Sequence, residues 1–317
     1  MRRIILDVDT GIDDALAILY ALRRPGISLE AVTTTYGNID IAQATRNSLQ
    51  ILEAAGRTDI PVARGAARAL VRPYTKKGSV IHGANGFGGI KLPEQKAEPV
   101  ARFAPDFIID LVRAHPGEIT LVPVGPLTNI ALALMRAPDL AEKLAGIVFM
   151  GGTIHHPGTP SMPSPMAEVN IFNDPEAART VIASGALLTM IGLDVTMTTK
   201  LTEEMIARMA KRADAANDLA GRVTMEAARA YLNAYQRQYP GITYCALHDP
   251  LAVAVAEDPS LVTLQPMKLD VECVGEITRG QIIPDLRKVA GVVPNTSVAM
   301  LVDAPTFEAR FEAALGG

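Results

Sequence analysis

The chain has 317 residues, of which 49% are hydrophobic and 20% are charged, a balance typical of globular proteins that excludes intrinsic disorder. The formal net charge of −4 and the lack of a basic stripe argue against nucleic acid as a partner. No apolar run is long enough to span a membrane and no signal-peptide core follows Arg2 and Arg3, so we expect a cytoplasmic protein that acts on a small molecule.

Short apolar runs alternate with segments of helical periodicity along most of the chain. Strands are predicted at Ile4–Val8, Leu29–Thr34, Ile119–Pro123, Ile147–Met150, Leu188–Leu193, Met267–Val274 and Ser297–Val302. Helices are predicted at Asp13–Arg23, Gln43–Ala55, Pro105–Ala114, Leu127–Met135, Pro175–Ala183 and Thr202–Met209, with a mostly helical region from Asp214 to Glu257 and a closing helix. This order predicts an α/β fold with an open, mostly parallel, Rossmann-like sheet covered by helices on both faces. No linker or repeat divides the chain, so we interpret residues 1–317 as a single domain.

Four aspartates gather where the first strand ends and the first helix begins, at Asp7, Asp9, Asp13 and Asp14. Aspartate is favoured at helix starts, where it caps free N–H groups, and this accounts for one or two of the four. Four carboxylates at the end of a buried strand repel one another unless a cation neutralises them. Oxygen ligands without cysteine or histidine favour calcium or magnesium over zinc. The sequence therefore predicts a metal site at the edge of the sheet where ligands of such folds bind.

The segment Ile4–Ala15, IILDVDTGIDDA, resembles the signature of the inosine–uridine-preferring nucleoside hydrolase family. Six further segments resemble family segments in the same order, namely TTTYGN at Thr33–Asn38, IHGANG at Ile81–Gly86, LVPVGPLTNIA at Leu121–Ala131, MGG at Met150–Gly152, AEVNIFNDPEAA at Ala167–Ala178 and HDPLAVA at His248–Ala254. The resemblance implies an enzyme that hydrolyses the N-glycosidic bond of ribonucleosides to ribose and free base, in a calcium-dependent reaction.

The resemblance also implies which residues hold the calcium. Its ligands would be the carboxylates of Asp9, Asp14 and Asp249 and the main-chain carbonyl of Val124. Calcium takes six to eight oxygen ligands, which leaves room for a water and two ribose hydroxyls. Asp9 would serve as general base toward that water, and Asp7 would support Asp9 from behind.

Four residues would bind the ribose. Asp13 and Asn38 would hydrogen-bond its hydroxyls at one end, while Glu168 and Asn170, on one side of an extended segment, would hold the other end. Because lost hydrogen bonds to buried groups are costly, these contacts predict a preference for ribosides over 2′-deoxyribosides.

The leaving base needs a proton, and His248 is the best candidate for the acid because the pKa of histidine can sit near neutrality. His82, on the glycine-rich loop, is the second candidate. Tyr231, Tyr235 and Tyr239 recur at four-residue spacing on one face of a predicted helix, which favours packing in the core or an interface. A role of Tyr235 in flanking the nucleobase stays open beside that interpretation.

The chain departs from the family pattern near Met162, where an asparagine often contacts the ribose 5′-hydroxyl. A modified substrate or a main-chain contact would account for this difference. The chain has no tryptophan, which argues against the purine-specific members and favours a broad or pyrimidine/inosine-type specificity. A homodimer or homotetramer is expected from the family.

Two alternative functions follow from the same residues. The strand followed by DVDT is similar to the nucleophile motif of haloacid-dehalogenase-like phosphatases, but Gly11 stands where that motif needs threonine or valine. A non-catalytic riboside-binding protein would keep the same pocket without turnover. Release of phosphate from a phosphomonoester would favour the first, and tight nucleoside binding without release of base would favour the second.

Overall fold

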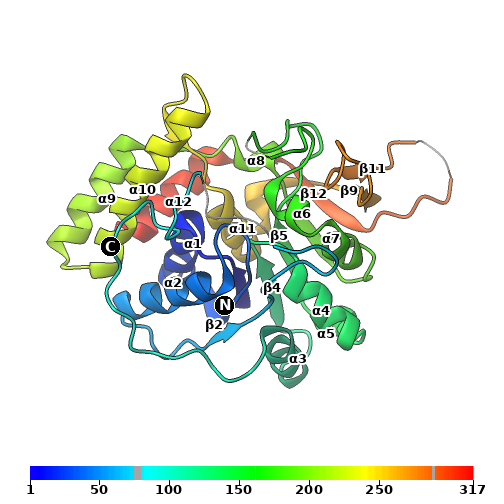
Figure 1. Cartoon of the computed structure of the whole chain (residues 1–317), viewed down its shortest axis with the longest axis horizontal. Coiled ribbons are helices and arrows are strands. Elements are labelled where there is room, and N and C mark those ends of the chain that lie inside the picture. Colours follow the sequence, from blue (N-terminus) through cyan, green and yellow to red (C-terminus); the bar gives the residue numbers. More distant parts are fainter. Residues whose placement is uncertain (75–79, 161, 288–289, 317) are drawn as a thin grey trace.

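The computed structural model of the chain describes residues 1–74, 80–160, 162–287 and 290–316. An eight-stranded sheet runs through the molecule with helices on both faces (Figure 1). Its strands lie in the order β3-β2-β1-β4-β5-β6-β12-β9. Neighbouring strands are parallel, except that the edge strand β9 runs antiparallel to β12. The structure thus confirms the predicted α/β fold with an open, mostly parallel sheet.

The strands of this sheet are β1 (Arg2–Val8), β2 (Ile27–Thr34), β3 (Val62–Arg64), β4 (Ile119–Pro123), β5 (Gly146–Met150), β6 (Leu188–Ile191), β9 (Val262–Met267) and β12 (Thr296–Val302). Two ribbons lie outside it, β7 (Leu201–Thr202) with β8 (Tyr244–Cys245) and β10 (Leu269–Val271) with β11 (Ile282–Pro284).

The helices are α1 (Ile12–Arg23), α2 (Ile41–Ala54), α3 (Ala104–Ala114), α4 (Thr128–Arg136), α5 (Leu140–Lys143), α6 (Val169–Asn173), α7 (Pro175–Ile182), α8 (Leu193–Thr196), α9 (Glu203–Ala215), α10 (Leu219–Gln238), α11 (His248–Glu257) and α12 (Ala304–Leu315). A short 3₁₀ helix covers Pro259–Leu261. Within the described ranges, no helix combines the length and the apolar character that crossing a membrane requires.

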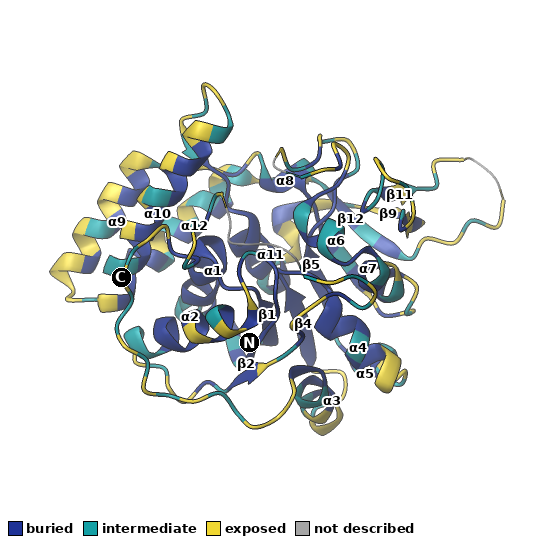
Figure 2. Ribbon diagram, viewed as in Figure 1, coloured by how far each residue is buried: buried dark blue, intermediate teal, exposed yellow. Residues whose placement is uncertain are grey.

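The alternation of side chains along β1 divides the interior into two cores. Ile4, Leu6 and Val8 pack in one core with residues of α1, α10, α11 and α12. Ile5 packs in the other core with residues of α3, α4 and α7. Helices therefore cover both faces, and the central strands and α11 are buried while the outer faces of α9 and α10 are exposed (Figure 2).

Two of the predicted strands are wrong in extent. The strand predicted at Met267–Val274 does not exist as one element, because β9 ends at Met267 and β10 pairs with β11 outside the main sheet. The side-chain amide of Asn295 bonds both the N–H and the carbonyl of Leu269, which holds the chain away from the sheet at this point. The strand predicted at Leu188–Leu193 ends at Ile191, because Gly192 caps α8. The helical region from Asp214 to Glu257 is confirmed by α10 and α11, which fill most of it.

An aromatic cluster joins the first and last helices. The ring of Tyr20 on α1 lies 6.3 Å from that of Phe307 and 6.0 Å from that of Phe311, both on α12. All three side chains are buried, so α12 is fixed on the core through them.

We predict that Phe311→Ala lowers the free energy of unfolding by about 3–5 kcal/mol, because it removes a buried ring and leaves a cavity. Leu187→Ala, at a side chain that is 73% exposed, should change it by less than about 0.5 kcal/mol. Urea denaturation followed by circular dichroism measures both. Equal losses for the two variants would show that the aromatic cluster does not anchor α12.

Candidate active site

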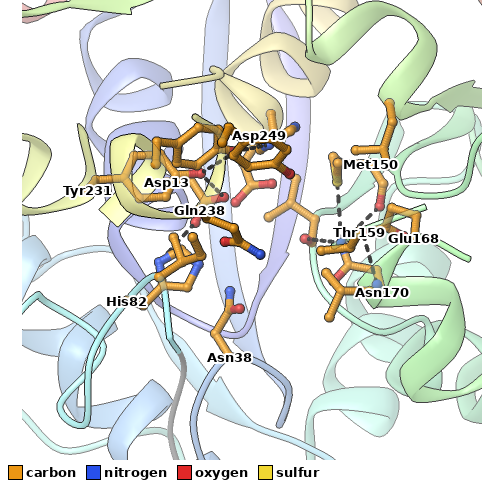
Figure 3. Close-up of a pocket in the computed structure, with 17 residues that line it drawn as sticks. Asp13, Asn38, His82, Met150, Thr159, Glu168, Asn170, Tyr231, Gln238 and Asp249 are labelled. Atoms are coloured by element: carbon orange, nitrogen blue, oxygen red, sulfur yellow. Dashed lines mark hydrogen bonds and ion pairs between the residues drawn. The ribbon is translucent and has the colours of Figure 1, made fainter. Parts of the chain in front are cut away.

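The candidate site lies where the strand order reverses beside β1. The chain leaves β1 toward β2 on one side, and β4 is added on the other side, so the loops after these strands diverge at the carboxyl edge of the sheet. A pocket opens at this edge and is lined by Asp13, Asn38, Ile81, His82, Val124, Met150, Thr159, Glu168, Val169, Asn170, Leu193, Tyr231, Tyr235, Gln238, Tyr239, His248 and Asp249. Figure 3 shows Asp13, His82, Tyr231 and Asp249 on one side, facing Met150, Thr159, Glu168 and Asn170 on the other.

Three buried carboxylates meet at the base of this pocket. Asp13, Asp14 and Asp249 each offer an oxygen, and these oxygens all lie within 4.8 Å of one another. Asp13 and Asp14 occupy the first turn of α1, and Asp249 occupies the first turn of α11. Two helices therefore direct their positive dipole ends at the cluster, which offsets part of the repulsion between its charges.

The electrostatics of the cluster favour a bound cation. Burial raises the pKa of Asp14 well above its ordinary value, and the charges of Asp9 and Asp13 raise it further. Burial also raises the pKa of Asp249, with further contributions from Asp13, Asp14 and Asp9. A divalent cation would neutralise these charges, and a donor set made of oxygens suits a hard ion such as calcium or magnesium. The residues present therefore fit a metal.

Asp9 lies beside this cluster, although it is not one of the three carboxylates that meet within 4.8 Å. Its backbone N–H donates to Asp14 Oδ1 at 3.0 Å, and its own carboxylate accepts the backbone N–H of Asn38. A Cβ at Gly37 would overlap Asp9 Oδ2, and a Cβ at Gly125 would lie 3.0 Å from Asp9 Oδ1. The glycines after β2 and β4 thus allow both loops to close on this carboxylate.

Asp7 braces the same loops from within the sheet. Its Oδ1 accepts the Thr33 hydroxyl at 2.5 Å and the side-chain amide of Asn129 at 2.8 Å, while its backbone carbonyl accepts the N–H of Val124 at 2.8 Å. Burial raises the pKa of Asp7 to about 7. Its contacts tie β1 to β2 and to the segment that carries Val124, which fits the supporting role expected for it.

The opposite wall is built on the start of α6. Glu168 caps this helix, with its carboxylate accepting the N–H groups of Gly152 and Asn170 at 2.9 Å each and of Ile171 at 3.2 Å. Burial raises the pKa of Glu168 to about 7. The Asn170 amide donates to the carbonyl of Val124 at 2.8 Å. The expectation that Glu168 and Asn170 lie on an extended segment is wrong, because the cap turns the chain into a helix and brings both residues to the pocket.

A chain of hydrogen bonds runs along the aromatic side of the pocket. The Tyr231 hydroxyl lies 3.3 Å from Asp13 Oδ2 and 3.5 Å from the Tyr235 hydroxyl. The Tyr235 hydroxyl lies 2.5 Å from His248 Nε2, and Thr196 Oγ1 lies 2.7 Å from His248 Nδ1. Burial lowers the pKa of His248 to about 4, below the near-neutral value expected from the sequence. The imidazole is therefore neutral at pH 7, and the hydroxyls of Tyr235 and Thr196 lie at its two ring nitrogens.

His82 reaches the pocket from the glycine-rich loop. Its ring stacks on Tyr231 with centroids 5.4 Å apart, and its Nδ1 accepts the N–H of Ile12 at 3.2 Å. The same Nδ1 lies 3.7 Å from Asp13 Oδ1. The hydrogen bond from the Ile12 N–H needs a lone pair on Nδ1, so we assign the ring proton to Nε2. The contact between Nδ1 and Asp13 is therefore not an ion pair. A Cβ at Gly11 would lie 2.7 Å from Nδ1, so the glycine permits this approach.

Sequence reasoning missed Thr159, Thr196 and Gln238. Thr159 and Gln238 line the pocket, whereas Met162, where the family asparagine was sought, does not. Thr196 lies at the end of the short helix α8 that follows β6. Polar residues just after strands are candidates for function, but the predicted strand extended too far, to Leu193, and Thr196 was not considered. Tyr231 and Tyr239 line the pocket together with Tyr235, so the tyrosine face of α10 serves both the core and the pocket.

Comparisons with known proteins agree with this geometry. A model of the family described as inosine-uridine preferring nucleoside hydrolase matches residues 4–309. The inosine-uridine preferring nucleoside hydrolase of Crithidia fasciculata is 39% identical over 309 residues, covering 96% of this chain and 95% of that protein. The solved structure of a purine-preferring ribonucleoside hydrolase from Gardnerella vaginalis has a TM-score of 0.93 and 38% identity, covering 100% of this chain and 98% of that one. A plant nucleoside hydrolase has a TM-score of 0.91 and 33% identity, covering 100% and 99%. The chain therefore belongs to the inosine-uridine preferring nucleoside hydrolase family.

Proposed function

We propose that this ribonucleoside hydrolase, which releases ribose and a free base, holds Ca²⁺ with the carboxylates of Asp9, Asp14 and Asp249 and the carbonyl of Val124. The observation that carries the proposal is the meeting of the buried carboxylates of Asp13, Asp14 and Asp249. Burial and neighbouring charges raise the pKa values of Asp14 and Asp249. Calcium accommodates more ligands and looser geometry than magnesium, which suits donors from three separate segments.

When bound, the cation supplies positive charge that orients the ribose hydroxyls and makes a nearby water more acidic. Asp9 accepts the proton of the attacking water, whose oxygen bonds to the anomeric carbon as the C–N bond breaks. The bonding electrons leave with the base, which must gain a proton, and positive charge develops on the ribose ring in between. Asp9 suits this role because two glycine loops close on its carboxylate, while its backbone N–H donates to Asp14.

The two walls of the pocket would grip the two ends of the ribose. Asp13 and Asn38 would bind the 2′- and 3′-hydroxyls near the acidic cluster, while Glu168 and Asn170 would face the 5′ end. Thr159 also lines the pocket, and Figure 3 places it on this second wall. Its hydroxyl would take the place of the asparagine that the family often has near Met162.

The base would lie against the tyrosines of α10 and receive its proton through Tyr235. His248 binds the Tyr235 hydroxyl at 2.5 Å, and a proton taken up by the imidazole can pass through that hydroxyl to the leaving base. His82, stacked on Tyr231, would close the pocket from the other side. The absence of tryptophan favours a broad or inosine/pyrimidine-type preference.

Assembly and location stay predictions. We expect a homodimer or homotetramer in the cytoplasm, with nucleosides rather than nucleic acid or membranes as the partners. Membership of the family speaks against the phosphatase alternative.

We predict that Asp249→Asn removes the stabilisation by calcium. Saturation at 100 times the Kd should stabilise the chelated wild-type protein by about 2.7 kcal/mol, whereas the variant should gain little. Without metal, the variant should melt at or above the wild-type temperature, because one repelling charge is gone. Thermal denaturation in chelator and in calcium measures both effects, with the exposed Glu276→Gln as control. An unchanged calcium response in Asp249→Asn would contradict the ligand assignment.

We predict that His248→Ala and Tyr235→Phe lower kcat/KM for uridine and inosine by about 10²–10⁴, the usual contribution of a positioned acid. A riboside with a nitrophenol leaving group needs no proton, so its hydrolysis should change far less. Steady-state kinetics with the natural nucleosides and with the nitrophenyl riboside measures this difference. Similar losses on both would remove the Tyr235–His248 pair from the proton pathway.

We predict that Thr159→Val lowers kcat/KM for uridine about 3- to 10-fold, the value of one neutral hydrogen bond, and leaves 5′-deoxyuridine unaffected. Thr159→Ser keeps the hydroxyl and should behave like the wild type on both. If Thr159→Val slows the two substrates equally, the residue shapes the pocket without binding the 5′-hydroxyl.

A further inference from the structure

A second cavity, of about 330 Å³, lies apart from the substrate pocket. Its lining includes Tyr36, Arg72, Tyr74, Phe172, Asn173 and Arg279, none of which lines the substrate pocket. The contributing segments are the loop after β2, residues 72–74, the end of α6 and the connection between β10 and β11, which lie on the α6 and α7 side of the molecule (Figure 1). The volume is at the lower end of the range of small-molecule sites.

Two guanidinium groups share this cavity. Arg72 Nη2 donates to Glu176 Oε1 at 3.0 Å and to the carbonyl of Cys273 at 2.8 Å. The Arg279 guanidinium stacks on the ring of Phe172, 4.2 Å from its centroid, and makes no ion pair within the described residues. Burial lowers the pKa of Arg279, and the charge of Arg72 lowers it further. Glu176 offsets the charge of Arg72, so Arg279 is the arginine at this cavity whose charge no ion pair within the described residues neutralises.

The acidic groups nearby do not line the cavity. Glu176 pairs with Arg72 from outside, and one of its oxygens has no partner in the described residues. The Asp174 carboxylate accepts the N–H groups of Leu70 and Ala177 and the hydroxyl of Thr128. No carboxylate of the described residues therefore lines the cavity.

Two buried donors at the cavity also need an acceptor. Arg72 Nε and Asn173 Nδ2 have no hydrogen-bond partner among the described residues. Buried donors without acceptors are costly, and both of these belong to residues that line the cavity.

The position of Arg279 is built into the backbone. Gly280 has a φ of +82°, and a Cβ there would lie 2.7 Å from Phe172 Cα. Only glycine lets this segment lie so close to α6. The stack on Phe172 fixes the plane of the guanidinium and leaves its N–H edge free for an anion.

We propose that this cavity binds a small phosphate-bearing anion, either inorganic phosphate or the phosphate ester of a small metabolite. Arg72 and Arg279 bind the phosphate oxygens. The Tyr36 and Tyr74 rings, with centroids 5.0 Å apart, form a flat wall for the rest of an ester. The Tyr74 hydroxyl donates to the carbonyl of Gly37, so the site lies behind the loop that carries Asn38.

Calorimetric titration of the calcium-loaded protein with inorganic phosphate, and separately with ribose 5-phosphate, tests the proposal. We expect saturable binding of one anion per chain that saturating ribose does not displace, because the acidic substrate pocket repels anions. Arg279→Gln should weaken binding at least about 10-fold, since it removes one charged partner. Arg179→Gln, at an exposed arginine paired with Asp270, should bind like the wild type. Tighter binding of ribose 5-phosphate would identify an ester as the ligand, and equal binding would identify phosphate itself.

Three results would overturn the proposal, namely no saturable binding at millimolar anion, equal affinity in Arg279→Gln and wild type, or displacement by ribose. Ribose release from uridine by both variants shows that they are folded, because neither residue lines the substrate pocket. The outcome is thus separate from that of the proposed hydrolysis.

Discussion

The crowding of buried carboxylates at the carboxyl end of β1 is the constraint on which the rest of the site depends. Asp13, Asp14 and Asp249 meet within 4.8 Å, and Asp9 lies beside them. Helix dipoles, backbone N–H groups and a cation each offset the repulsion within such a cluster. The fold supplies the first two, because α1 and α11 both begin there and N–H groups of the first loop bond to Asp14. The cation is what the arrangement still requires.

The carboxylates at the bottom of the pocket and the tyrosines along its side have separate parts in the proposed reaction. In the proposed mechanism, the carboxylates act on the water and the ribose, where positive charge develops. The hydrogen-bonded chain from Tyr231 through Tyr235 to His248 would act on the leaving base. The two parts meet at Asp13, which the Tyr231 hydroxyl approaches at 3.3 Å. The cavity behind the loop after β2 is lined by Arg72 and Arg279, whereas carboxylates line the base of the substrate pocket.

Most of the fold, and most of the residues at the candidate site, could be predicted from the sequence, because periodicity and motif order reveal buried strands and the loops after them. The positions of these residues relative to one another could not be predicted. The sequence did not predict that the oxygens of Asp13, Asp14 and Asp249 meet within 4.8 Å, or that Gly37 and Gly125 lie against the carboxylate of Asp9. Thr159 and Thr196 escaped notice because their roles depend on how loops fold back over the sheet. The neutral state of His248 depends on burial, which no local pattern reveals. The strand predicted at Met267–Val274 failed because a distant side chain, Asn295, decides where the chain leaves the sheet.

Ribose release from inosine, uridine, cytidine and adenosine, measured as calcium is removed by chelation and then restored, tests the central claim most directly. The account predicts that release falls to background as bound calcium falls to zero, and that it returns in proportion to the calcium bound, with one ion per chain at full activity. Ribose release that persists at the full rate in protein shown to be free of metal would contradict the claim that the buried carboxylates act through a cation.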